Sequence, residues 1–155
     1  MPSFANAKLA SGKGDFEFSA ANVKQARVRA RRMTGPQLLE AIEMYQPYEN
    51  AFHNTSEKRA AFKPEPFDSY PGTVVYDRTF PIQKPLDRSE LIKLTWSEIL
   101  GQEKTGPLFF EIEGTATEGV EAKNVIVQSL VEFTDLGLMQ KTNGRETLIL
   151  SLIHI

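Results

Sequence analysis

Alternation of apolar and polar positions is clearest in the last third of the chain and predicts strands there. The predicted strands are residues 108–114, 124–133 and 147–155. In the first of them, Phe110 and Ile112 share one face, while Glu111 and Glu113 share the other. We therefore expect an antiparallel sheet in this region to form the core of the protein.

The last predicted strand, residues 147–155, is apolar at both alternating sets of positions. One set is Leu148, Leu150 and Leu152, and the other is Ile149, Ile153 and Ile155. In a sheet with one solvent-exposed face, apolar and polar residues alternate along each strand. This strand does not alternate in that way, so we expect it to be covered on both sides. A helix or another subunit would supply the second cover. The Asn143-Gly144 pair predicts a hairpin turn at residues 141–145.

An earlier stretch, residues 22–33, fits a strand better than a helix. One face would carry Ala26, Val28 and Ala30, and the other Arg27, Arg29 and Arg31. Residues 16–20 would pair with it as a hairpin. The arginine stripe could bind phosphate, but such stripes are more often solvated or paired with carboxylates of a partner.

Helical spacing appears twice. Pro36 follows Thr34 and Gly35 and opens a predicted helix over residues 36–45, which should end before Pro47. A second helix is predicted over residues 87–100. There, Asp87 and Glu90 form an acidic capping box, and the apolar side is Leu91, Ile92, Trp96, Ile99 and Leu100. A strand at residues 73–80 precedes it.

Two stretches show no regular spacing of apolar residues. Residues 1–14 are small and polar, which is typical of a flexible arm that is either a disordered tail or orders on a neighbouring subunit. Residues 46–72 alternate prolines with aromatic residues. A loop this long inside a compact domain usually has a purpose, so we expect it to pack across the body or onto a neighbour.

Together these elements predict a mainly β (α+β) fold, an antiparallel β-sandwich or barrel with one or two flanking helices. The 155 residues fit a single domain, 1–155, and are enough for one core. The net charge of −2 argues against a dedicated nucleic-acid binder. No apolar run reaches the length of a membrane span, so no membrane partner is expected.

Candidate chemistry is sparse. The chain has no cysteine, and its two histidines, His53 and His154, lack the spacing of metal ligands. The carboxylates Glu111 and Glu113 fit a solvated acidic face better than an acid–base pair. The sequence therefore predicts no catalytic residue, no metal, no cofactor and no enzymatic activity.

The order of elements resembles that of the tail-tube proteins of tailed phages and the related tubes of contractile injection systems. The run Arg31-Arg32-Met33-Thr34-Gly35 after a strand is similar to one in some tube proteins. The resemblance implies a homo-oligomer of stacked, hexameric rings, with other virion proteins as partners. It implies a tail-tube or connector-ring component of the virion, assembled in the host cytoplasm. The helix at 36–45 and the stretch to residue 72 depart from this pattern.

Self-assembly would use the arginine stripe, the aromatic loop and the last strand. The candidate subunit interface is Arg27, Arg29, Arg31, Tyr48, Phe52, Phe62, Phe67, Ile149, Ile153 and Ile155. Within a tube, Glu111, Glu113 and Glu132 would form an acidic lumen that repels DNA phosphates, so the duplex passes without sticking.

The alternative is a monomeric β-rich module that binds a small ligand or a protein. Its apolar pocket would lie under the 48–70 loop, lined by Phe52, Phe62, Phe67, Trp96 and Phe110. The state of the last strand discriminates between the two hypotheses. Burial within one chain would favour the pocket, and exposure in the monomer would favour assembly.

Overall fold

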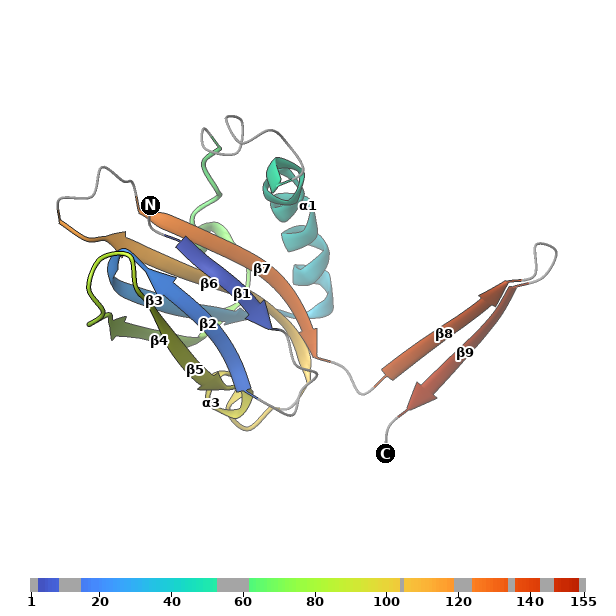
Figure 1. Ribbon diagram of the computed structural model, residues 1–155. Helices are drawn as coiled ribbons and strands as arrows, with labels where there is room; N and C mark the ends of the chain where they lie inside the picture. The colour runs from blue at the N-terminus through green and yellow to red at the C-terminus, as the bar shows by residue number, and fades with distance from the viewer. Residues whose placement is uncertain are drawn as a thin grey trace.

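Two antiparallel sheets pack face to face in the computed structural model, which describes residues 3–8, 15–52, 62–103, 105–118, 124–133, 136–142 and 147–153 (Figure 1). The first sheet, sheet A, has the order β1 (Ser3–Lys8), β2 (Asp15–Ala21), β5 (Ser89–Thr95). The second, sheet B, has the order β4 (Thr73–Pro81), β3 (Val23–Arg32), β6 (Gly106–Ala116), β7 (Val125–Phe133). With two α-helices beside these sheets, the predicted mainly β, antiparallel sandwich is confirmed.

The core lies between the two sheets and follows from alternation along the strands. In β3, Ala26, Val28 and Ala30 are fully buried, as their shared face predicted. From the facing sheet, Phe16 and Phe18 of β2 meet them. The small alanines on β3 leave room for these large rings, so the two layers interlock.

The predicted helix over residues 87–100 is wrong. Residues 89–95 are strand β5, paired antiparallel with β2, and only Trp96–Leu100 form a helix, α3. Leu91, Ile92 and Leu94 fit either period, and pairing with the phenylalanines of β2 decides for the strand. The capping box exists, but at the end of β5: Glu98 N donates to Thr95 Oγ1 at 3.3 Å, and Thr95 N donates to Glu98 Oε2 at 2.9 Å.

Asp87, the expected helix cap, lies in a turn with a positive φ of 62°. Its backbone N–H donates to Asn22 Oδ1 at 2.7 Å, and its carboxylate accepts from Asn22 Nδ2 at 3.2 Å. Asp and Asn tolerate the left-handed region better than most residues, so both suit this corner. The pair ties the 82–88 connection to the turn between β2 and β3.

Helix α1 (Gly35–Phe52) continues through Pro47, where the sequence predicted its end. An internal proline costs a helix roughly 3 kcal/mol. Burial of Ala51 and of Tyr48, whose hydroxyl accepts a hydrogen bond from Gln128 N of sheet B, offsets that cost. At the start of the helix, Thr34 and Gln37 exchange hydrogen bonds in a reciprocal cap, which fixes where α1 begins.

The last strand does not belong to the core, contrary to the prediction. Strands β8 (Leu136–Thr142) and β9 (Thr147–Ile153) form a separate two-stranded antiparallel sheet that projects from the sandwich (Figure 1). The chain has a strand, β8, where none was expected, and β9 takes it as partner. At the other end, residues 3–8, expected as part of a flexible arm, form β1 on the edge of sheet A.

Candidate interaction surfaces

The arginine stripe of β3 lies on the outer face of sheet B and pairs within the chain. Arg27 makes two bonds to Asp77, of 2.8 Å and 2.6 Å, and Arg29 donates to Glu111 at 2.6 Å. Arg31 donates to the carbonyl of Gly72 at 2.8 Å. The carboxylates that the sequence assigned to a partner therefore come from the neighbouring strands β4 and β6.

Burial divides these ion pairs into two kinds. The Arg27 and Asp77 side chains remain 43% and 39% exposed, and the hydrogen bond from Arg27 holds the pKa of Asp77 below its usual range. Arg29 and Glu111 are 13% and 2% exposed. Burial of both charges costs free energy, so this pair depends on further hydrogen bonds.

Those further bonds come from Gln128 of β7, which lies directly opposite Glu111 in the sheet. Its Nε2 donates to Glu111 Oε2 at 2.8 Å and to the carbonyl of Glu65 at 2.7 Å. One amide group therefore joins sheet B to the segment before β4. Glu111 is committed to this network, so it is not a solvent-facing residue of a lumen.

Residues 62–72, which we call the strap, cross the outer face of sheet B. The ring of Phe67 packs against two guanidinium groups. Its centroid lies 4.2 Å from Arg29 Cζ and 5.3 Å from Arg31 Cζ. Tyr70 stacks on Phe109 of β6, with ring centroids 3.6 Å apart. Gly72 ends the strap with φ +104°, where a Cβ would lie 2.3 Å from Arg32 O. The strap is thus fixed on sheet B immediately before β4 begins.

Helix α1 covers the rest of this face through two tyrosines. Tyr45 donates its hydroxyl to Gln128 O at 3.2 Å, and Tyr48 accepts from Gln128 N at 3.0 Å. The two bonds satisfy the backbone N–H and C=O of Gln128 in the middle of β7, an edge strand of sheet B. Burial raises the pKa of Tyr48 and of Tyr70 to about 12, so both phenols stay protonated at alkaline pH values where a free tyrosine ionises.

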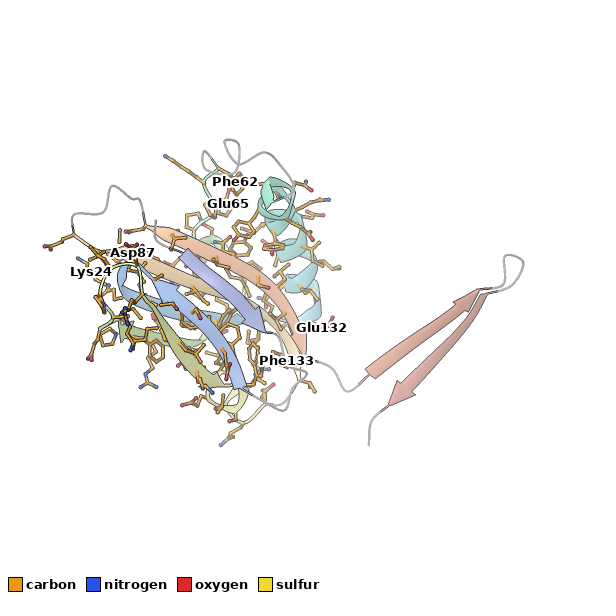
Figure 2. All side chains as sticks on the ribbon, in the orientation of Figure 1. Lys24, Phe62, Glu65, Asp87, Glu132 and Phe133 are labelled. Carbon is orange, nitrogen blue, oxygen red and sulfur yellow. The ribbon has the colours of Figure 1, made fainter. Side chains whose placement is uncertain are left out.

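The described residues that were predicted to line one pocket lie on two sides of sheet B. Phe67 and Phe109 lie in the cluster beneath α1, whereas Trp96 and Phe110 lie between the two sheets. Neighbours along a strand point to opposite faces, so sheet B separates the two sets. Phe62 contacts Tyr48 near the end of α1, beside Glu65 (Figure 2). The Phe52 side chain lies outside the described part of the structure.

The other candidate residues are scattered. Glu113 lies 3.7 Å from Arg29, and Glu132 is exposed at the end of β7 (Figure 2). Ile149 and Ile153 belong to β9, while Ile155, His53 and His154 fall outside the described residues.

The described residues hold no group of three side chains that could bind a metal ion. Among the helices that the structure describes, none is long and apolar enough to span a membrane.

Sequence reasoning missed two features of this surface. One is Gln128, whose signal was a polar residue between Ile126 and Leu130 on an apolar strand face. The other is an exposed apolar pair on α1, Leu39 and Ile42, because helical spacing alone does not decide which apolar residues of a helix face the body.

The fold is a β-sandwich with one face of sheet B closed by a helix and a strap, and a hairpin outside it. No protein-family model and no curated protein matches the sequence. The structure is similar to native alpha-2-macroglobulin from Escherichia coli spanning domains NIE-MG1, with TM-score 0.59 and 14% identity over 98% of this chain. A second structure of that protein, spanning domains MG0-NIE-MG1, gives TM-score 0.58 and 16% identity over 98% of this chain.

This chain spans 69% of the first of those chains and 45% of the second. At such identity the likeness shows the fold alone, a β-sandwich similar to that in the two alpha-2-macroglobulin structures. The resemblance to phage tail-tube proteins is therefore wrong, as are the virion component and the tube lumen inferred from it. The resemblance was inferred from the order of strands and helices. That order included a predicted helix at 87–100, most of which is strand β5.

Proposed function

We propose that this chain is a non-catalytic β-sandwich module that joins a neighbouring β-rich module through hairpin β8–β9. The observation that carries the proposal is the separation of the hairpin. In the described part of the chain, β8 and β9 pair with each other and with no strand of the sandwich. The described core between sheets A and B is built from residues of β2, β3, β5, α3, β6 and β7.

An isolated two-stranded hairpin is marginally stable in water. Strand β9, Thr147–Ile153, is apolar in sequence at both alternating sets of positions, so it gains stability only when both faces are covered. The free edges of β8 and β9 also carry unpaired backbone groups that a further strand can satisfy. A β-rich neighbour supplies both the cover and the pairing.

The buried polar groups support a structural role over a catalytic one. The side chains of this cluster bond one another. Arg29 donates to Glu111, and Gln128 donates to Glu111 and to the strap carbonyl of Glu65. Such a cluster fixes the helix and strap on the sheet and offers no free acid or base. The similar structures support the modular reading, because each spans more than one named domain of a larger protein.

Hydrogen–deuterium exchange of the full chain, followed by mass spectrometry, tests the proposal. We expect β3 and β6 amides to exchange only through global unfolding, and β8–β9 amides to exchange at least about 100-fold faster. As a matched pair, Leu150→Asp in β9 should leave the melting temperature of the sandwich unchanged, whereas Leu108→Asp in the core should abolish folding. Equal protection of hairpin and sandwich in a monomer would contradict the proposal.

Light scattering on the same sample identifies a different outcome. A doubled mass together with a protected hairpin would mean that a second copy covers β8–β9. That result would replace the neighbouring module by a homo-oligomer as the function of the hairpin.

A further inference from the structure

The outward face of α1 carries two exposed apolar side chains. Leu39 is 67% exposed, the highest value for a large apolar side chain among the described residues, and Ile42 is 46% exposed. Residues three apart lie on the same side of a helix, so the two are neighbours. The opposite side of α1 holds Ala41 and Tyr48 against sheet B, so this pair faces away from the sandwich. Figure 1 shows α1 on the outside of the body.

Acidic residues flank this pair. Glu40, Glu43 and Glu49 are all exposed, and residues 35–52 contain no lysine, arginine or histidine. None of the ion pairs within the described residues uses these three carboxylates. The free face of α1 is therefore apolar at its centre and negative at its rim.

Helix stability does not explain the glutamates. A helix gains from acids in its first turn and bases in its last turn, but α1 has neither. Glu49 instead lies near the C-terminal end, where its charge opposes the helix dipole. Glu40 and Glu43 form a like-charge pair three residues apart, which is also unfavourable. Residues that weaken their own element are expected where a surface serves a partner.

We propose that this face, defined by Leu39, Ile42 and the glutamates at 40, 43 and 49, docks a basic amphipathic helix of a partner protein. The partner's apolar stripe would cover Leu39 and Ile42, and its flanking lysines or arginines would pair with the three carboxylates. The surface is small, so the complex is weak and depends on salt. The proposal is independent of the hairpin, which lies outside the sandwich that α1 covers.

Fluorescence anisotropy tests the proposal with the full chain and a labelled helical peptide made of leucine and lysine at amphipathic spacing. We expect saturable binding that weakens at high salt. Leu39→Ser with Ile42→Ser, and separately Glu40→Lys with Glu43→Lys, should each reduce the affinity by about tenfold. All four side chains are exposed, so circular dichroism should show an unchanged fold.

The matched control is Leu91→Ser with Glu132→Lys, because Leu91 is 53% exposed and Glu132 is exposed on other elements. This control should bind the peptide as the unaltered chain does. Equal losses in control and test variants would overturn the proposal, since they would indicate only general attraction to an acidic protein. Absence of saturable binding would also overturn it.

Discussion

Strands β3 and β6, at the centre of sheet B, are largely buried on both faces, but different interactions bury the two faces. The inner face of these strands is apolar at its centre, and it packs against rings such as Phe16 of sheet A and Trp96 of α3. The outer face mixes the rings of Phe67 and Phe109 with the buried ion pair Arg29–Glu111. The same strands, β3 and β6, supply both faces.

The two faces differ in how well they tolerate the substitution of a residue. An apolar layer loses stability in proportion to the volume removed, because its contacts are non-directional. A buried polar cluster depends on every partner, because an unpaired charge or amide inside the protein is costly. The inner face therefore stabilises the sandwich, and the outer face determines where α1 and the strap lie. The following predictions test this contrast, from the largest expected effect to the smallest.

Phe110→Ala should have the largest effect, lowering the free energy of unfolding by about 3–5 kcal/mol. Phe110 is 4% exposed and contacts Phe16, with ring centroids 5.0 Å apart. Trp96, the only tryptophan, lies 6.1 Å from it and reports on the inner layer by fluorescence. Chemical denaturation followed at Trp96 measures the loss.

Phe109→Ala is the matched variant on the outer face. It should destabilise the protein as well, and it should expose the strap to limited proteolysis because Tyr70 loses its stacking partner. The native emission of Trp96 should change in Phe110→Ala and stay constant in Phe109→Ala. An equal spectral change in both variants would show that the two faces are not separate layers.

Glu111→Gln should lower the free energy of unfolding by about 3 kcal/mol, because Arg29 keeps its buried charge without its nearest partner. The double variant Arg29→Met with Glu111→Leu should recover at least half of that loss, since the charges leave together. Asp77→Asn, at the exposed pair with Arg27, should cost about 1 kcal/mol or less. A double variant less stable than Glu111→Gln would contradict this account.

Alkaline pH should weaken the outer face. In the unfolded chain the Tyr70 phenol ionises near its usual pKa, whereas burial raises its folded pKa to about 12. Between those values the unfolded state binds fewer protons, so stability falls as pH rises, by about 1 kcal/mol at pH 11. Tyr70→Phe should flatten this decline, measured by thermal unfolding at pH 9 and pH 11.

Tyr48→Phe provides the contrast for the alkaline experiment. Its pKa is raised to about 12 as well, but its hydroxyl accepts a hydrogen bond from Gln128 N, which Phe cannot replace. Among the described residues the Tyr70 hydroxyl has no such partner. Tyr48→Phe should therefore lose stability at neutral pH, and Tyr70→Phe should not. Equal stability of the two variants at neutral pH would count against the hydrogen bond to Gln128.

Several elements followed from the sequence because alternation is a local property. The strands at 22–33, 73–80, 108–114 and 124–133 appear as β3, β4, β6 and β7. The division of β3 into an alanine–valine face and an arginine face is also as predicted. Each depends only on period two, which the backbone of a strand imposes on any side chain.

Other features depended on partners distant in sequence, and the tertiary structure alone decided them. Residues 89–95 are a strand because β2 pairs with them, and α1 passes Pro47 because sheet B holds the turn beyond it. The carboxylates of the arginine stripe come from β4 and β6, between 50 and 82 residues away in the chain. Local spacing cannot encode such contacts, since free energy from pairing and burial arises only when the distant segments meet.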